Sequence, residues 1–346
     1  MAERLLEVKD LKVQFATEDG IVQAVDGVSF NLDRGKVLGI VGESGSGKSV
    51  TAMSLMGLTR GVNARFEGEV LYKGTDLLHV SDRNMQDFRG NELGMIFQDP
   101  MTSLNPVYRI GEQIVEAIQA HENVGKRAAR ARTVELLRQV GIPNPETRVD
   151  DFPHQFSGGM RQRAMIAMAL SCNPSVLIAD EPTTALDVTI QAQIVELVDR
   201  LKDDFDSAVI FITHDLGVIA EIADEIIVMY AGRVVEQGSK RDLFYDPQHP
   251  YTWGLLGSIP RLDRPRVERL HTIEGSPPSL INPPEGCKFR PRCPHAFEKC
   301  TQEPALENHV EERAHLDRCW LDVEAKRTRR EVDGQIGLGT VTEGIP

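Results

Sequence analysis

The sequence predicts an α/β fold with a parallel sheet at its centre. Three short runs, VLGIVG at 37–42, SVLIAD at 175–180 and AVIFIT at 208–213, are mostly apolar without alternation, as expected for strands that are buried on both faces. Between the last two runs, apolar residues from Ile190 to Leu201 recur at helical spacing. The order strand, helix, strand is typical of parallel strands joined by a crossover helix.

Local patterns predict the first elements of the chain. The first thirty residues read as an antiparallel hairpin, with a turn at Glu18, Asp19 and Gly20. The strand at 37–42 comes next, and a helix should begin directly after it, near Lys48. A buried strand is thus followed by a glycine-rich turn and a helix.

The middle of the chain is predicted to be mostly helical. The stretches 111–140 and 157–170 lack strand alternation and are rich in helix formers, so we expect a helical subdomain over about 99–170. A second hairpin near 226–238 follows the last buried strand.

The composition changes after this hairpin. From about 240 to 320 the chain is rich in proline, which predicts a small domain held by specific contacts rather than by regular elements. We therefore expect a main domain at 1–238, an extension at 239–325 and a flexible tail at 326–346, where large apolar groups are few.

Composition and charge exclude several classes of protein. The 41% hydrophobic and 26% charged residues are those of an ordinary globular chain. The 52 Asp and Glu outnumber the 39 Lys and Arg, and the formal net charge of -13 opposes the basic surface that nucleic acid requires. No run of roughly 18 apolar residues is present, so we expect no membrane span, and the first residues do not resemble an export signal.

A phosphate-binding loop is predicted at 42–49. The letters GESGSGKS satisfy G-x-x-x-x-G-K-[ST] between a predicted strand and a predicted helix. The glycines let backbone N–H groups surround phosphate oxygens, Lys48 reaches the β- and γ-phosphates, and Ser49 can bind magnesium. The predicted phosphate-binding residues are Gly42, Ser44, Gly45, Gly47, Lys48 and Ser49.

Two acidic residues, Asp180 and Glu181, lie at the carboxyl end of the predicted strand at 175–180. If this strand lies beside the loop, Asp180 is placed to hold magnesium, and Glu181 is placed to activate the attacking water. An Asp-Glu pair alone is more often a helix cap, so this assignment depends on the phosphate-binding loop.

The string FSGGMRQR at 156–163, followed by LIADEPTTALD, resembles the cassette of ABC transporter ATPases over about residues 5–240. The resemblance implies a P-loop NTPase fold of the RecA type with an N-terminal antiparallel β subdomain. It also implies a loop made by Ser157, Gly158 and Gly159 that serves the ATP of a second cassette. Met160 departs from the usual glutamine, at a position that does not face phosphate.

The same resemblance implies roles for four more residues. Gln98 corresponds to the glutamine near the attacking water and magnesium, and Asp187 to the acid that links the two nucleotide sites. His214 corresponds to the histidine that contacts the γ-phosphate. Phe15 corresponds to the aromatic residue that stacks on adenine, although a core phenylalanine in the hairpin explains it equally well.

The strings HPYTWGLL at 249–256, CKFRPRCPHAFEKC at 287–300 and DPMTSLNP at 99–106 resemble the ATPases of oligopeptide and dipeptide importers. This implies an ATP-hydrolysing subunit that docks peripherally on the cytoplasmic face of a membrane. Its implied partners are two permease subunits, a second cassette, identical or related, and an extracytoplasmic peptide-binding protein. A nickel chelate as solute, or a soluble ABC ATPase acting on nucleic acid, are the alternatives.

Four cysteines of the extension form a separate candidate site: Cys287, Cys293, Cys300 and Cys319. They can hold a four-iron four-sulfur (4Fe-4S) cluster or zinc, or they can be unmetallated thiols. The wide spacing favours the cluster, because structural zinc sites usually offer pairs two to four residues apart. Cys172 lies far away and reads as a small core residue. A further interpretation is that these four cysteines act as a redox sensor that regulates the ATPase.

Overall fold

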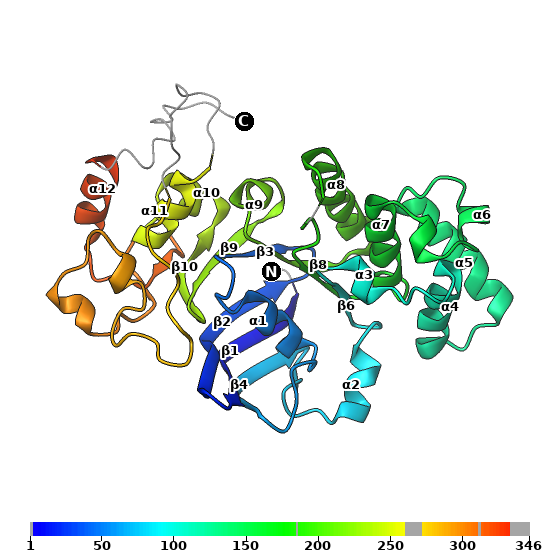
Figure 1. Cartoon of the computed structure of the whole chain (residues 1–346), viewed down its shortest axis with the longest axis horizontal. Helices are drawn as coiled ribbons and strands as arrows, with labels where there is room; N and C mark the ends of the chain where they lie inside the picture. Colours follow the sequence, from blue (N-terminus) through cyan, green and yellow to red (C-terminus); the bar gives the residue numbers. More distant parts are fainter. Residues whose placement is uncertain (1–2, 185, 260–271, 311–312, 333–346) are drawn as a thin grey trace.

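Two sheets organise the chain in the computed structural model, which describes residues 3–184, 186–259, 272–310 and 313–332 (Figure 1). One sheet is small and antiparallel, and the other is a larger mixed sheet. The predicted α/β fold is therefore confirmed. Among the described helices, none combines the length and the apolar character needed to cross a membrane.

The small sheet is formed by the first part of the chain. In order across the sheet, its strands are β2 (Gly20–Asp33), β1 (Arg4–Thr17), β4 (Ala64–Tyr72) and β5 (Thr75–Asp76). β1 and β2 form the predicted N-terminal hairpin, in which Thr17 pairs with Gly20 across the turn.

The central sheet contains the predicted buried strands. In order, its strands are β11 (Glu307–Asn308), β12 (Leu316–Asp317), β10 (Arg233–Ser239), β9 (Glu225–Tyr230), β3 (Val37–Val41), β8 (Ala208–Thr213), β7 (Val176–Asp180) and β6 (Leu93–Ile96). The strands from β9 to β6 are parallel, so their carboxyl ends meet at one edge. β9 and β10 form the predicted second hairpin.

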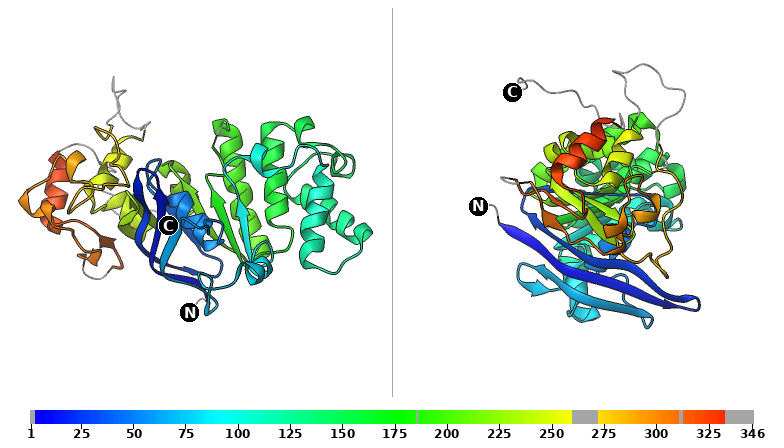
Figure 2. Two further views of the ribbon diagram at one scale, coloured as in Figure 1. Left: turned by 60° about the horizontal axis from the view of Figure 1, so that its bottom comes forward. Right: turned by 90° about the vertical axis from the view of Figure 1, so that its left-hand side faces the viewer.

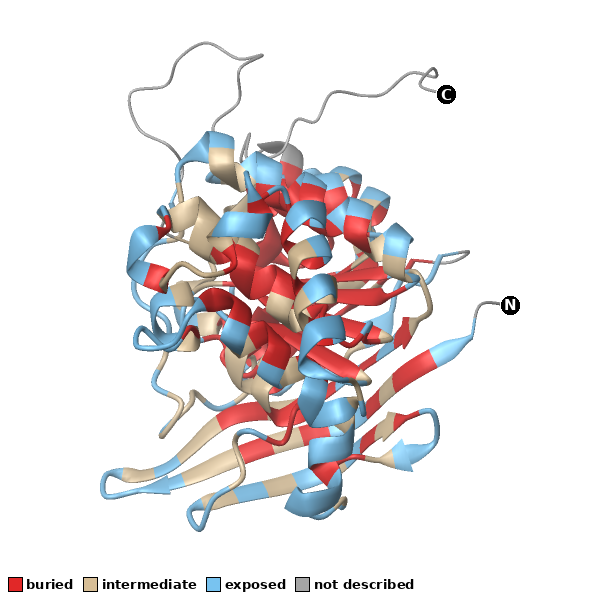
Figure 3. Cartoon of the chain, turned by 90° about the vertical axis from the view of Figure 1, so that its right-hand side faces the viewer, coloured by how far each residue is buried: buried red, intermediate tan, exposed pale blue. Residues whose placement is uncertain are grey.

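Hydrophobic cores lie on both faces of the central sheet. Every residue of β3 is buried, and its side chains alternate between the two cores: Val37 and Val41 belong to one, and Leu38 and Ile40 to the other. Figure 3 shows the buried residues concentrated along the central strands and the inner faces of their helices. Uniform hydrophobicity of this run therefore reflects burial on both faces, as predicted.

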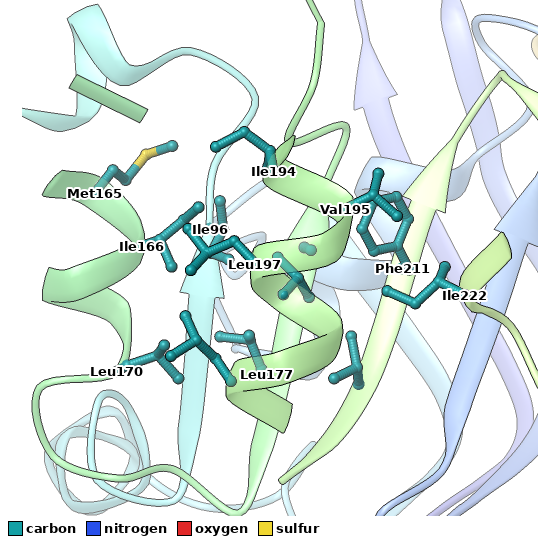
Figure 4. Close-up of a cluster of buried hydrophobic side chains, with 14 of the residues drawn as sticks. Ile96, Met165, Ile166, Leu170, Leu177, Ile194, Val195, Leu197, Phe211 and Ile222 are labelled. Carbon is teal, nitrogen blue, oxygen red and sulfur yellow. The ribbon is translucent and has the colours of Figure 1, made fainter. Parts of the chain in front are cut away.

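Three helices cover one face of the central sheet: α7 (Gly158–Ala169), α8 (Val188–Phe205) and α9 (Leu216–Ile222). Ile166 of α7, Leu197 of α8 and Ile96 of β6 point toward one another in this core (Figure 4). On the other face, α1 (Lys48–Leu55) contributes Ala52 and Leu55 to the core shared with the small sheet. Packing on both faces holds the central sheet in place, including the edge where the carboxyl ends of its parallel strands meet.

The helical subdomain and the extension lie at opposite ends of the molecule, with the two sheets between them (Figures 1 and 2). Between α1 and α7 lie α2 (Asp82–Phe88), α3 (Pro100–Ser103), α4 (Ile110–His121), α5 (Lys126–Gln139), α6 (Pro145–Arg148) and the 3-10 turn η1 (Pro153–Gln155). The predicted helical character of 111–140 and 157–170 is confirmed.

The extension is built on the edge of the central sheet. Its strand β12 pairs antiparallel with β10, with Asp317 opposite Glu236, and β11 pairs with β12. Within its described residues, the helices are α10 (Lys240–Tyr245), α11 (Pro250–Gly257) and α12 (Val323–Val332), and the 3-10 turns are η2 (Arg290–Arg292) and η3 (Glu298–Thr301).

The predicted start of the flexible tail, at residue 326, is wrong. Lys326 lies on α12 and is fully buried, with its ammonium 2.6 Å from the carboxylate of Asp317, which is also fully buried. Arg327 and Arg330 of the same helix form ion pairs with Asp246. Ion pairs rather than apolar side chains anchor this helix, so composition misses it. The rest of the predicted tail, 333–346, lies outside the described residues.

Candidate functional site

The glycine-rich loop joins the carboxyl end of β3 to α1. Gly47, directly before α1, has a φ of 101°, and a Cβ there would lie 2.4 Å from the carbonyl oxygen of Ala24. Only glycine fits this close approach and this left-handed backbone. The first N–H groups of α1 have no partner within the helix, so they are available to an anion at the loop.

Lys48 is the first residue of α1, and its side chain is 4% exposed. Its Nζ donates to the carbonyl oxygens of Gly42, at 2.8 Å, and Glu43, at 3.0 Å. Burial lowers the pKa of Lys48, and the nearby carboxylates of Glu181 and Asp180 oppose that shift. A buried ammonium at the mouth of a glycine-rich loop is suited to contact phosphate oxygens.

Ser49 and Asp180 meet at the base of the site. The Ser49 hydroxyl donates to the Asp180 carboxylate at 3.0 Å, because β7 lies two strands from β3 and ends beside the loop. Burial raises the pKa of Asp180, and the Ser49 hydrogen bond partly offsets this. A hydroxyl and a buried carboxylate are oxygen donors of the kind that magnesium prefers, so this pair fits that ion.

The Glu181 carboxylate lies where four polar side chains converge. It accepts hydrogen bonds from Gln98 Nε2, at 3.0 Å, and from Thr184 Oγ1, at 2.9 Å. Lys48 Nζ lies 3.9 Å and His214 Nδ1 lies 3.6 Å from the same carboxylate. These residues follow β6, β7, β3 and β8, whose carboxyl ends share one edge of the sheet.

The backbone of Glu181 is held in an unusual conformation. Its φ is 47°, in the left-handed region that residues with a Cβ adopt rarely. Its N–H donates to the carbonyl oxygen of Ile212 in β8 at 2.9 Å, which continues the pairing of β7 with β8 by one residue. Such strain is often found at functional positions, and here it aims the carboxylate at the loop.

An open cavity of about 1980 Å³, counting the space open to solvent, brings most of the predicted site residues together. Val22 and Ala24 of β2 lie on its wall with Phe15 of β1, as an apolar surface beside the loop. The predicted residues that line it are Phe15, Gly42, Ser44, Gly45, Gly47, Lys48, Ser49, Gln98, Glu181 and His214.

Four predicted residues lie elsewhere in the single chain: Ser157, Gly158, Gly159 and Asp187. The Ser157 hydroxyl caps α7 by accepting from the N–H of Met160, and Asp187 caps α8 by accepting from Ile190. The cavity lining includes none of the four. They lie at the amino ends of α7 and α8, away from the glycine-rich loop.

Sequence reasoning missed the contribution of the extension to this site. Leu255, Ile273 and Leu280 line the cavity, and Arg292 and Tyr251 contact the loop residue Glu43. The strings HPYTWGLL and CKFRPRCPHAFEKC, which contain Tyr251 and Arg292, identified the extension but gave no indication that it contacts the loop. Thr184, which donates to the Glu181 carboxylate, was also missed, in the string EPTTALD.

The four cysteines of the extension line one small cavity, with room for about one water molecule, together with His249, His295 and several aromatic residues. Burial raises the pKa of Cys287 and raises those of Cys293 and Cys319 to about 12. Nevertheless, no three His, Cys, Asp or Glu side chains in the described part of the chain are grouped so as to hold a metal ion. The predicted Cys172 is a buried core residue.

Comparison with known families gives two matches along the chain. Residues 25–184 match the ABC transporter family, and residues 235–300 match the C-terminal region of oligopeptide/dipeptide transporters. The two matches fall on the part that carries the glycine-rich loop and on the extension.

Close relatives cover nearly the whole chain. Oligopeptide transport ATP-binding protein OppD of Bacillus subtilis is 56% identical over 320 residues, which are 92% of this chain and 89% of the relative. Dipeptide transport ATP-binding protein DppD of the same organism is 52% identical, over 92% of this chain and 95% of the relative.

Solved structures resemble the main domain. The dimeric structure of the ABC transporter cassette MJ0796 is 27% identical, with a TM-score of 0.61, over 68% of this chain and 99% of that cassette. CbiO1 of Clostridium perfringens, part of an ABC transporter complex, is 27% identical with a TM-score of 0.60, over 70% of this chain and 91% of that protein.

Proposed function

This chain belongs to the family of oligopeptide and dipeptide transport ATP-binding proteins, and from that membership we propose that ATP bound at loop 42–49 is hydrolysed to power peptide import. The convergence of Lys48, Gln98 and His214 on the carboxylate of Glu181 is the observation that carries this proposal. It joins a phosphate-binding cation, a polar side chain that can orient water and a general base in one cavity.

Binding of the triphosphate falls to the loop and the first turn of α1. Lys48 supplies a charge-assisted contact to the β- and γ-phosphates, and the loop N–H groups surround the same oxygens. Ser49 and Asp180 would hold the magnesium ion, with Gln98 as a further oxygen donor, and the bound ion neutralises phosphate charge. Phe15 lies on the apolar wall beside the loop, where it can stack on adenine.

Glu181 acts as the general base in this proposal. Its carboxylate takes a proton from the water that attacks the γ-phosphate, while the amide of Gln98 holds that water in line. His214 is 62% exposed in the single chain, so its ring is free to reach the γ-phosphate. Thr184 keeps the carboxylate oriented through its hydroxyl.

A second cassette completes the site. Ser157, Gly158 and Gly159 open α7 outside the cavity of their own chain, so their N–H groups and hydroxyl are available to nucleotide bound by a partner. Asp187 would link the two sites across the same interface. The next residue, Val188, is 82% exposed, which supports burial of this loop against a partner.

Two permease subunits would dock beside Gln98, on the cytoplasmic face of the membrane. Four apolar side chains are exposed along the segment that follows β6: Phe97, Met101, Val107 and Tyr108. An apolar surface in an otherwise polar region fits a helix of a membrane subunit. Because the segment adjoins Gln98, movement there can reach the site. A peptide-binding protein outside the membrane would select the solute.

The cysteine cavity is the second part of the proposal. The four thiols that line one cavity match, in number and kind, the ligands of a 4Fe-4S cluster. Neither the cluster nor zinc has a preformed site, because the described residues include no grouping of side chains that could hold a metal ion; zinc would need four sulfurs about 2.3 Å from one point. If the cluster forms, it would cross-link segments of the proline-rich extension and stabilise its fold, as structural metals do in other small domains.

Uptake by vesicles tests the transport proposal. The chain would be assembled with its permeases, its second cassette and the binding protein in vesicles, with ATP on the cassette side. We expect ATP-dependent accumulation of a labelled oligopeptide that unlabelled dipeptides or oligopeptides compete away. Accumulation of a nickel chelate instead would overturn the peptide assignment, and the absence of any ATP-dependent uptake would overturn the transport role.

A further inference from the structure

The extension grips the glycine-rich loop at Glu43. Arg292, in η2 of the extension, forms a two-pronged ion pair with this residue: Nη1 lies 2.6 Å from Oε2 and Nη2 lies 3.0 Å from Oε1. The two residues are 249 positions apart in the sequence. A planar guanidinium on a carboxylate fixes direction as well as distance, so this contact defines where the Glu43 side chain lies.

Arg292 is itself immobilised. Its side chain is 5% exposed, its Nε donates to the carbonyl oxygen of Glu274 at 2.9 Å, and its Nη2 donates to that of Ile273 at 3.2 Å. The guanidinium carbon also lies 5.8 Å from the centre of the Tyr230 ring. Because Ile273 lines the nucleotide cavity, one arginine ties the loop to the cavity wall contributed by the extension.

Tyr251 of α11 makes a second contact with the same loop residue. Its hydroxyl accepts a hydrogen bond from the backbone N–H of Glu43 at 2.8 Å. The ring is fully buried between Tyr230, at 4.7 Å, and Phe289, at 5.4 Å between ring centres. Burial raises the pKa of Tyr251 far above its ordinary value, so the hydroxyl stays neutral.

These contacts lead directly to the phosphate-binding lysine. Tyr251 holds the N–H of Glu43 and Arg292 holds its carboxylate, and the carbonyl oxygen of the same residue accepts a hydrogen bond from Lys48 Nζ at 3.0 Å. We propose that Arg292 and Tyr251 are positioning residues that fix Glu43 and, through it, Lys48, so that the extension sets the affinity of the loop for nucleotide. This inference rests on the proposed ATP site.

A purely structural role for Arg292 makes a different prediction. The extension is also docked by Lys288, whose ammonium lies 2.8 Å from Asp26, and by the pairing of β12 with β10. Loss of the ion pair between Arg292 and Glu43 should therefore leave the extension docked on the main domain. If Arg292 served only the extension, through its bonds to Ile273 and Glu274, its removal would act independently of Glu43.

Calorimetric titration of the full chain with MgADP separates these roles. The variants are Glu43→Gln, Arg292→Gln, their double variant and Tyr251→Phe. The control is Arg130→Gln, which breaks an equally two-pronged pair with Asp150 in the helical subdomain, at 2.9 and 2.6 Å. Thermal unfolding checks that each variant is folded.

We expect Glu43→Gln and Arg292→Gln each to raise the Kd for MgADP about tenfold, as for loss of a charge-assisted hydrogen bond. The double variant should match either single variant, because both remove one interaction. Tyr251→Phe should raise the Kd about threefold while its ring packing stays, and Arg130→Gln should leave the Kd unchanged. If Arg292→Gln fails to fold, Glu43→Gln and Tyr251→Phe carry the test.

Kd values for Glu43→Gln and Tyr251→Phe within about twofold of the wild-type value would overturn the proposal, and so would fully additive effects in the double variant. Lys48→Ala distinguishes a failure of the site itself. If Lys48→Ala bound MgADP as tightly as the wild-type chain, the proposed ATP site would be wrong. If it lost binding while the Glu43 variants kept it, only the coupling to the extension would be wrong.

Discussion

The side-chain amide of Gln98 donates a hydrogen bond of 3.0 Å to the carboxylate of Glu181, although the two residues are 83 positions apart. Neighbouring parallel strands bring them together: Gln98 follows β6, and Glu181 follows β7. The contact connects the exposed apolar segment after β6 with the proposed catalytic base. The edge of the sheet therefore places the surface proposed for permease docking next to the residue proposed to promote ATP hydrolysis.

Replacement of Lys48 tests the phosphate-binding role. Lys48→Ala removes a buried ammonium that faces the loop, so we expect the affinity for MgATP to fall about 100-fold. Equilibrium binding of a fluorescent ATP analogue measures this. Lys36→Ala, on an exposed lysine paired with Asp224, is the control and should bind normally. Unchanged affinity in Lys48→Ala would refute the assignment of the loop.

The buried pair of Lys326 and Asp317 should anchor α12. Lys326→Ala leaves the buried Asp317 carboxylate with the His309 ring, at 2.9 Å, but without its ammonium partner, so we expect the free energy of unfolding to fall by about 3 to 5 kcal/mol. Denaturant unfolding followed by circular dichroism measures the change. Arg329→Ala, on an exposed face of the same helix, should change stability by less than about 0.5 kcal/mol. Equal effects of the two substitutions would contradict the anchoring role.

His315 should make the stability of the extension depend on pH. Its fully buried ring lies 2.7 Å from Glu236, and this carboxylate raises the pKa of His315 above its ordinary value of 6.5 despite burial. A raised folded-state pKa means that the stabilisation is complete below about pH 6.5 and is lost as the pH rises through the folded value.

The comparison is with His315→Gln, which has no charge to lose. We expect the melting temperature of the wild-type chain to exceed that of the variant most at about pH 6, with a gap that narrows towards pH 9. A gap that widens as the pH rises would show that the sign of this coupling is wrong.

Chemical analysis tests the cysteine proposal. A chain purified without oxygen should contain about four iron and four sulfide ions and absorb broadly in the visible range. Cys293→Ser should lose most of the iron, whereas Cys172→Ala, which alters a cysteine of the main core, should keep it. Stoichiometric zinc would establish the zinc alternative, and a metal-free chain with a folded extension would establish unmetallated thiols.

The parallel sheet and its loop could be predicted because their signals are local. Apolar runs such as VLGIVG indicate a strand buried on both faces. The glycines at 42–47 adopt positive φ angles that residues with a Cβ rarely adopt. Once strand order is known, Asp180, Glu181 and Gln98 fall at one edge. The residue types and the motif were therefore enough to locate most of the cavity.

Contacts between distant segments could not be predicted. Nothing near Glu43 indicates that Arg292 will reach it, because a pairing across 249 positions depends on how the extension folds. The same limit hid α12, whose few apolar residues resemble a disordered tail. Its Lys326 becomes a core residue only because Asp317 is buried beside it.

Hydrolysis by a Glu181 variant tests the central claim most directly. In the assembled transporter, Glu181→Gln should bind MgATP with wild-type affinity but hydrolyse it roughly 10² to 10⁴ times more slowly, the usual effect of losing a positioned base. Glu221→Gln, on the exposed surface of α9, is the control and should keep the wild-type rate. A near-normal rate in Glu181→Gln would remove this carboxylate from the mechanism.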